Sequence, residues 1–216
     1  MEMNTPATIG PGEFFPVVGV GPHEKPWPTG AQYDPELLEN GDRRNVLDHY
    51  RYWSVEAIVA DLDTKRHKLH IAIENWQHDL NIGSVVRTAN AFNVSAVHIV
   101  GKRDWNKRGA MVTDKYLKVI HHPTIADFAT WCKENNLPII GIDNVPSSKQ
   151  LEGSQLPEYC VLLFGQEGAG MSDEGIDACE VLYAIQQYGS TRSMNASAAG
   201  AIAMYHWALQ HLPKLS

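Results

Sequence analysis

The 216-residue chain carries a net charge of −7, with 44% hydrophobic and 20% charged residues. This composition predicts a globular protein of one domain plus an extension, and it excludes a fibrous or wholly disordered chain. No run approaches the ~20 apolar residues of a membrane span, so we expect no membrane partner. The three cysteines have neither an even number nor metal-ligand spacing, which predicts a reducing, cytoplasmic setting and no metal site.

The first 65 residues are predicted to form an extension. Seven of the twelve prolines fall in residues 1–35, interleaved with glycines, so regular structure there must be short. From Asp34 to Arg66 apolar residues recur at helical steps, which predicts helix. The residues that carry this period are Trp53, Ala57, Ile58 and Leu62. We therefore predict a Pro/Gly-rich and then helical extension at 1–65, followed by the main domain at 66–216.

Beyond the extension, short apolar runs alternate with helical stretches. The predicted strands are 68–75, 96–101, 137–143, 160–165 and 180–185. The predicted helices are 82–93, 124–136, 172–178 and 194–212. Strands separated by helices predict an α/β fold with a mostly parallel sheet and helices on both faces. Ligands of such sheets bind beyond the C-terminal strand ends, so we examine the segments that follow the strands.

The segment after the first strand, NWQHDLNIGSVVRTANAF, begins a helix. Asn81 is a favourable N-cap, and the apolar residues at helical spacing leave Arg87 outside their stripe. One interpretation is a capped helix with a solvated arginine. The other places an amide and a guanidinium at a strand end, where their donors can bind phosphate or ribose oxygens.

Two later strand ends are also unusual. In CVLLFGQEGAGMS, Gly165, Gly168 and Gly170 permit tight turns, but the Rossmann and P-loop spacings are missing. Glu167 lies between these glycines, either as a functional carboxylate or as a group stabilised by the following helix dipole. In QQYGSTRSMNASAAGAIAMY, short polar residues precede a helix of small side chains, which favours close helix packing.

Three of these segments together resemble a known family. NIGSVVRTANAF, LLFGQEGAGMS and STRSMNASAAGAIAMY are similar, in order and separation, to the three motifs of the SpoU (TrmH-like) branch of the SPOUT RNA 2′-O-ribose methyltransferases. The resemblance covers roughly residues 66–212. It implies a C-terminal deep trefoil knot, S-adenosylmethionine as cofactor, and a homodimer whose site is completed across the interface.

The resemblance also implies the site residues. Those matching the catalytic pattern are Asn81, Arg87, Glu167, Ser193 and Asn195, and those lining the cofactor pocket would be Ile142, Gly165, Ile185, Ser193 and Met194. The match departs at Gln186 and Gln187, where many relatives have Pro-Met, which puts the shape of the cofactor loop in question. Arg87 would act either as general base or as a charged stabiliser, because a guanidinium normally stays protonated.

Residues 65–118 hold ten Lys or Arg against four carboxylates, whereas residues 1–50 hold three against eight, so RNA would be attracted to the former. Within the basic segment, KRDWNKRG places cations around an aromatic ring. The predicted RNA-binding residues are Arg87, Lys102, Arg103, Trp105, Lys107 and Arg108. Trp105 would either stack on an unpaired base or fold onto the core. His121 and His122, before Pro123, are interpreted as a surface turn.

These patterns favour a methyltransferase acting on a ribose 2′-hydroxyl of tRNA or rRNA. The alternative on the same fold is a catalytically inactive RNA-binding or assembly module, against which the complete set of polar motif residues speaks. A third hypothesis is a nucleotide-dependent oxidoreductase, but the sequence lacks the glycine-rich fingerprint loop that such an enzyme needs.

Overall fold

The computed structural model describes residues 19–77 and 81–213. They form two compact units, a smaller one that ends at Ala60 and a larger one that begins at Asp61. The division falls within helix α2 (Val55–Asp63), and the predicted domain limit at residue 65 stays a prediction. The prolines at 6, 11 and 16 lie outside the described residues. Within the described ranges, no helix is long and apolar enough to cross a membrane.

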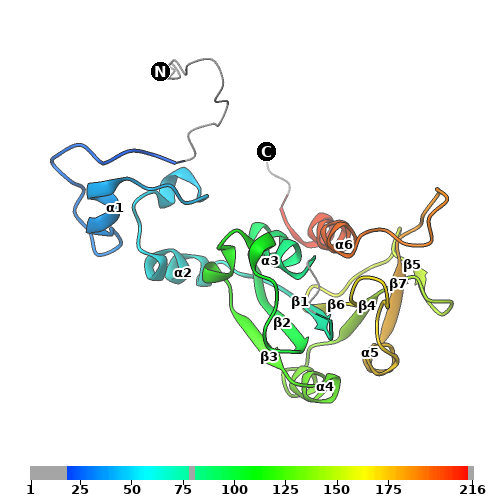
Figure 1. Cartoon of the computed structure of the whole chain (residues 1–216). Coiled ribbons are helices and arrows are strands. Elements are labelled where there is room, and N and C mark those ends of the chain that lie inside the picture. Colours follow the sequence, from blue (N-terminus) through cyan, green and yellow to red (C-terminus); the bar gives the residue numbers. More distant parts are fainter. Residues whose placement is uncertain (1–18, 78–80, 214–216) are drawn as a thin grey trace. The chain divides into compact units, whose positions relative to one another are not determined.

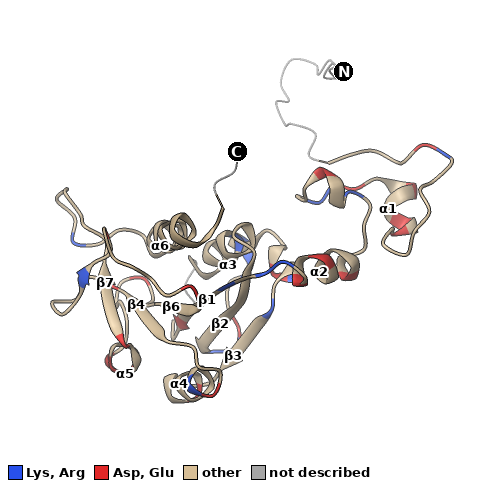
Figure 2. Ribbon diagram, turned by 180° about the vertical axis from the view of Figure 1, so that it is seen from behind, with Lys and Arg blue, Asp and Glu red and all other residues tan. Residues whose placement is uncertain are grey.

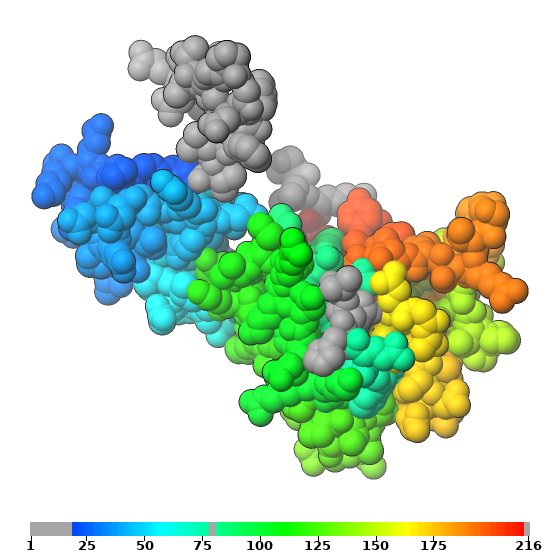
Figure 3. Space-filling model, viewed as in Figure 1, coloured from blue at the N-terminus to red at the C-terminus, as the bar shows by residue number. Residues whose placement is uncertain are grey.

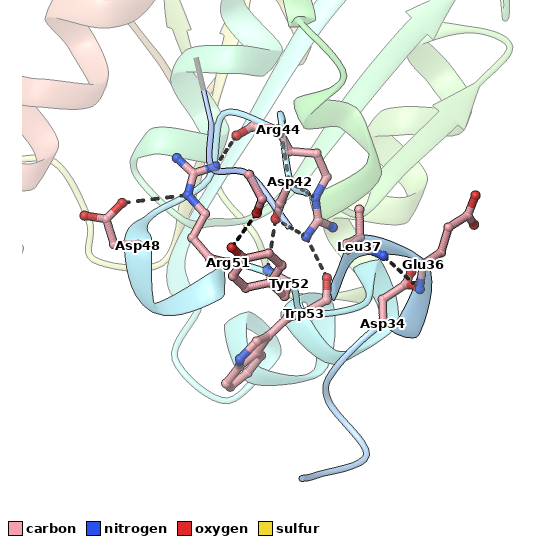
Figure 4. Close-up of polar contacts among 10 residues, drawn as sticks. Asp34, Glu36, Leu37, Asp42, Arg44, Asp48, Arg51, Tyr52 and Trp53 are labelled. Carbon is pink, nitrogen blue, oxygen red and sulfur yellow. Dashed lines mark hydrogen bonds and ion pairs between the residues drawn. The ribbon is translucent and has the colours of Figure 1, made fainter. Parts of the chain in front are cut away.

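The smaller unit is organised around a buried carboxylate. Asp42, fully buried, accepts hydrogen bonds from the Arg44 guanidinium (2.7 Å) and from the Tyr52 backbone N–H (3.0 Å), as Figure 4 shows. Burial alone would raise the pKa of Asp42, but the bonds from Arg44 and Tyr52 lower it to about 2. The loop that carries Asp42 is thereby fixed between short helices.

The prediction of continuous helical character from Asp34 to Arg66 is wrong in part. The chain forms α1 (Pro35–Asn40), the 3₁₀ turn η1 (Asp48–Tyr50) and α2, with irregular backbone between them. Gly41 (φ 90) and Tyr52 (φ 64) adopt left-handed backbone, which no helix can pass through. Trp53 therefore precedes α2. Figure 2 marks the acidic residues of α1 in red on the ribbon.

The larger unit contains a seven-stranded sheet in the order β3-β2-β1-β6-β4-β7-β5, and every pairing in it is parallel. The strands are β1 (His67–Asn75), β2 (Val94–Gly101), β3 (Val119–His122), β4 (Ile139–Ile142), β5 (Lys149–Gln150), β6 (Cys160–Phe164) and β7 (Val181–Ala184). The five predicted strands are confirmed, whereas β3 and β5 were not predicted. The parallel α/β architecture is confirmed.

Helices cover both faces of this sheet (Figure 1). They are α3 (Asn81–Ala91), α4 (Ile125–Glu134), α5 (Asp173–Ala178) and α6 (Ala196–His211), with 3₁₀ turns η2 (Arg108–Ala110) and η3 (Thr113–Tyr116). One hydrophobic core lies under α3 and α6, and a second lies under α4. Strand β6 serves both, because Leu162 belongs to the first and Leu163 to the second. Burying such a side chain contributes about 1.5–3 kcal/mol.

Three histidines form a buried row across adjacent strands. His70 Nδ1 lies 3.0 Å from His98 Nε2, and His98 Nδ1 lies 2.9 Å from His122 Nε2. All three rings are buried, with Trp131 packed against them. The interpretation of His121 and His122 as a surface turn is therefore wrong. His122 ends β3 inside the second core, and the His121 ring contacts the Gly101 carbonyl oxygen at 2.8 Å.

Candidate active site

A cavity of about 580 Å³ lies beyond the C-terminal ends of β4, β6 and β7. Its wall is built from residues 142–145, 164–171, 185, 187, 192–196 and 199. The set includes all five residues predicted to bind the cofactor, Ile142, Gly165, Ile185, Ser193 and Met194. Glu167 and Asn195, from the predicted catalytic set, also line it. The sheet thus brings the second and third motifs to one hollow.

The loop after β6 folds back tightly on itself. A Cβ atom at Gly165 would lie 2.2 Å from the Gly170 carbonyl carbon, a distance that no side chain tolerates. Gln166 and Gly170 exchange backbone hydrogen bonds of 3.2 and 3.1 Å, and Gly168 and Gly170 have φ values of 87° and 74°. Gly165 therefore lets the two ends of the loop pack backbone to backbone, and it lines the cavity from a buried position.

Two carboxylates from neighbouring strand ends hold the far end of this loop. Asp143, after β4, accepts the Met171 backbone N–H at 2.7 Å, and Glu74, on β1, accepts the Ser172 backbone N–H at 2.8 Å. Glu74 is fully buried, and this burial raises its pKa even though the bonds to Ser172 act in the opposite direction. In Figure 3 the yellow loop segment accordingly lies beside the teal end of β1.

Side chains of the three motifs meet at the rim of the cavity. The Asn81 amide donates to Glu167 Oε2, and the Asn195 amide donates to Asn81 Oδ1 at 2.8 Å and to Glu167 Oε1 at 3.4 Å. Asn81 is the first residue of α3, and Asn195 caps α6 by accepting the Ser197 backbone N–H at 3.0 Å. One carboxylate therefore ties together the starts of two helices and the loop after β6.

Arg87 lies apart from this cluster. It is exposed on α3 and is not among the residues that line the cavity. Within the described ranges it makes no hydrogen bond or ion pair with Asn81, Glu167 or Asn195. The structure thus brings together four of the five predicted catalytic residues, because Ser193 shares the cavity wall with Glu167 and Asn195, and it leaves the arginine outside.

The basic loop after β2 packs against the start of α3. The Asn75 amide donates to the backbone oxygens of Lys102 (2.7 Å) and Asp104 (2.9 Å). A Cβ atom at Gly83 would lie 2.7 Å from the Ala110 backbone nitrogen, so loop and helix backbones are in direct contact. The exposed cations of this loop, Lys102, Arg103, Lys107 and Arg108, are therefore held beside the first motif.

Trp105 is half-buried and packs against the first core, and Lys107 Nζ lies 5.5 Å from its ring centroid. Lys107 also pairs with Asp114 at 3.1 Å. The geometry is that of a tryptophan folded onto the core, with charged groups outside it.

Asp143, Asn144 and Arg192 line the cavity but were not singled out from the sequence. Asp143 ends a predicted strand and Asn144 directly follows it, so the strand-end rule could have found them. Arg192 stands inside the quoted segment STRSMN, but the motif match drew attention to Ser193 and Asn195 instead. In the described part of the chain, no group of three or more His, Cys, Asp or Glu could hold a metal ion.

The same three loops fall within a known protein family. The sequence model of the SpoU rRNA methylase family matches residues 68–205, which is more than half of the chain. The chain belongs to the SpoU rRNA methylase family. The SpoU match runs from β1 into α6 and so contains the whole cavity and its rim.

Curated relatives of this SpoU chain are 24–28% identical to it. The tRNA (guanosine(18)-2′-O)-methyltransferase of Saccharomyces cerevisiae is 24% identical over 71% of this chain, but the match spans only 12% of the yeast protein. Enzymes of the same name from Borreliella burgdorferi and Escherichia coli K12 are 25% and 26% identical over 67% and 68% of this chain, and 67% and 66% of their own length.

Solved structures share the fold. The TrmH/SpoU tRNA modifying enzyme of A. aeolicus superposes with a TM-score of 0.63 at 21% identity, covering 72% of this chain and 81% of its own. The SpoU methyltransferase AviRb of Streptomyces viridochromogenes, in complex with the cofactor AdoMet, superposes with a TM-score of 0.61 at 21% identity. The match covers 69% of this chain and 63% of the AviRb chain. The SPOUT fold of this chain is thereby established, and the knot stays a prediction of the family resemblance.

Proposed function

We propose that this SpoU chain transfers a methyl group from S-adenosylmethionine (AdoMet) to a ribose 2′-hydroxyl of RNA. The observation that carries the proposal is the hydrogen-bonded cluster of Asn81, Glu167 and Asn195 at the rim of the cavity. It joins the three motifs of the family at one point. Neither a buried core nor a plain helix cap requires two amides to share one carboxylate.

The cavity suits AdoMet. Its volume of about 580 Å³ lies within the roughly 300–1,000 Å³ of small-molecule sites. Gly165 keeps the loop after β6 folded along the cavity wall, and the residues that would hold the cofactor are Ile142, Gly165, Ile185, Ser193 and Met194. When bound, AdoMet supplies a methyl group on a positively charged sulfur.

The chain's own residues supply alignment and charge. As the ribose 2′-oxygen takes up the methyl group, its proton would be released to solvent, and S-adenosylhomocysteine would be the product that leaves. We assign Asn81, Ser193 and Asn195 to holding the ribose and the motif loops, and Glu167 to fixing both amides. Arg87 would meet the 2′-oxygen and an adjacent phosphate, because a guanidinium stays charged and offers a fork of donors.

RNA is the proposed substrate. The exposed cations Lys102, Arg103, Lys107 and Arg108 beside α3 could neutralise phosphates, and such binding weakens with added salt. Three curated relatives are named for guanosine 18 of tRNA, which makes tRNA the first substrate to test and rRNA the second.

We also propose a homodimer that completes the site. Helix α6 exposes an apolar stripe, with 43%, 58% and 59% of Ile202, Tyr205 and Leu209 accessible. A second copy covering this stripe would bury it, as large exposed apolar patches usually require. Because α6 packs on α3 and Arg87 lies outside the cavity of its own chain, the arginine would serve the cavity of the partner.

We further propose a cytoplasmic location. The three cysteines are free, and Cys132 and Cys160 are buried. Burial raises the pKa of each of these two thiols to about 12, which keeps them unreactive.

The decisive experiment is methyl transfer from radiolabelled AdoMet to unmodified tRNA and rRNA transcripts. A 2′-O-methyl group blocks alkaline cleavage at its own nucleotide, so we expect label in alkali-resistant dinucleotides. Mapping these sites in RNA from cells with and without the protein identifies the nucleotide. A chain that binds RNA but neither binds AdoMet by calorimetry nor labels any RNA would be an inactive binding module, and the proposal would be withdrawn.

A further inference from the structure

The cavity wall contains one cation. Among the described residues that line it, Arg192 is the only Lys, Arg or His, and Asp143 and Glu167 are the only carboxylates. A small ligand that enters this cavity therefore finds one positive group and two negative ones.

Both carboxylates are already engaged by the protein. Asp143 accepts the backbone N–H groups of Met171 and Asn144, each at 2.7 Å. Glu167 accepts the amides of Asn81 and Asn195. These bonds hold the cavity wall in place, so both carboxylates already have partners within the protein.

Arg192 is in the opposite situation. Its backbone carbonyl oxygen accepts hydrogen bonds from the side chains of Asn144 and Gln187, the latter at 3.4 Å, and this fixes the position of its main chain at the cavity. Its side chain is exposed, and its guanidinium has no hydrogen bond or ion pair within the described ranges. A guanidinium without a protein partner, on a backbone that is held in place, is suited to bind an anion.

We propose that Arg192 binds the α-carboxylate of AdoMet. The inference rests on the proposed function. AdoMet carries an ammonium, a sulfonium and a single carboxylate, so the one anionic group of the ligand matches the one cation of the wall. A guanidinium binds a carboxylate through two parallel hydrogen bonds, which fixes orientation as well as charge. Arg192 would thus set the direction in which the methionyl end lies and distinguish AdoMet from analogues without that group.

The test is a comparison of two ligands on the full chain. Isothermal titration calorimetry measures the affinities of AdoMet and of decarboxylated AdoMet, which lacks only the carboxylate. We expect the wild type to prefer AdoMet by about tenfold or more, since a hydrogen bond to a charged group is worth that much. In Arg192→Gln the preference should vanish through loss of AdoMet affinity, with the decarboxylated ligand bound as before.

Lys149→Gln is the matched control, because it removes one exposed positive charge on β5 without touching the cavity wall. It should keep the wild-type preference. A wild type that binds both ligands equally, or an Arg192→Gln chain that still prefers AdoMet, overturns the assignment while leaving the proposed function intact. If Arg192→Gln keeps that preference but loses affinity for RNA, the anion is a phosphate instead. A wild type that binds neither ligand ends both proposals.

Discussion

At the level of single residues, the position of Arg87 decides whether this arginine is a solvated side chain or a functional one. Sequence reasoning left it as either a solvated arginine or a functional one, and its exposure on α3 is compatible with both. The amides and the carboxylate of the rim cluster, by contrast, contact one another directly. A role for Arg87 therefore depends on what approaches it from outside its own chain.

Substituting Arg87 by Lys keeps the positive charge and removes the planar fork. We expect methyl transfer to fall by about 100-fold or more, because positioned electrostatic donors contribute on that scale. AdoMet affinity should stay unchanged, since Arg87 does not line the cavity. Single-turnover assays and calorimetry measure the two quantities. Arg43→Lys, an exposed arginine outside the family match, is the control, and wild-type turnover in Arg87→Lys would refute the assigned role.

Among the elements, the loop after β6 depends on one glycine. Gly165→Ala places a methyl group against the backbone of Gly170 and Met171, so the loop must shift at a cost of about 1–3 kcal/mol. We expect AdoMet affinity to fall about tenfold or more. Gly189→Ala is the matched control, because nothing lies within 4 Å of a Cβ atom at Gly189. Equal AdoMet affinity in the two variants, measured by calorimetry, would show that the loop is not part of the cofactor site.

The histidine row across β1, β2 and β3 predicts acid sensitivity. Burial lowers the pKa of His70 to about 4, and burial with the neighbouring rings lowers that of His98 to about 2. Because the folded pKa values lie below the ordinary value of about 6.5, the unfolded chain binds more protons at acidic pH. The contribution of these neutral histidines to the free energy of unfolding is therefore fully present at neutral pH and is lost progressively as the pH falls below about 6.5.

The expected loss is roughly 1.4 kcal/mol per pH unit for each histidine that stays neutral in the folded state. Urea unfolding between pH 7 and 4.5 measures it. His70→Gln keeps a hydrogen-bond donor for His98 but cannot titrate, so its stability should fall less steeply with acid. An identical slope in the wild type and in His70→Gln would contradict the assignment of the effect to this row.

Sequence reasoning found the strands that are short apolar runs between helices, namely β1, β2, β4, β6 and β7. The first four are mostly buried, whereas β7 is largely half-buried. β3 was missed because VIHH is half polar, and its second His is buried only through its ring neighbours. β5 has two exposed residues that no hydrophobic pattern marks. For the site, motifs indicated Glu167 and Asn195, but a contact between residues as distant in sequence as Asn81 and Asn195 required the folded chain.

For the whole molecule, the apolar stripe on α6 predicts a dimer. Leu209→Glu places a charge in the stripe and should convert the protein to monomers in sedimentation velocity runs, with methyl transfer falling in parallel because Arg87 could no longer reach a partner's cavity. Leu47→Glu alters a comparably exposed leucine, 66% against 59% accessible, in the smaller unit. It should remain dimeric. A wild type that is monomeric and fully active would remove both the dimer and the shared site.

The strand order also governs how the chain can be made. β1 lies inside the sheet between β2 and β6, so its second edge stays unpaired until β6 is made and Leu69 can pair with Cys160. While the polypeptide is still emerging from the ribosome, β3-β2-β1 can assemble with that apolar edge open, and an open parallel edge invites association with other chains. Synthesis interrupted before β6 should therefore yield more aggregates or chaperone-bound fragments than interruption after β7, when β4 is also paired on both edges.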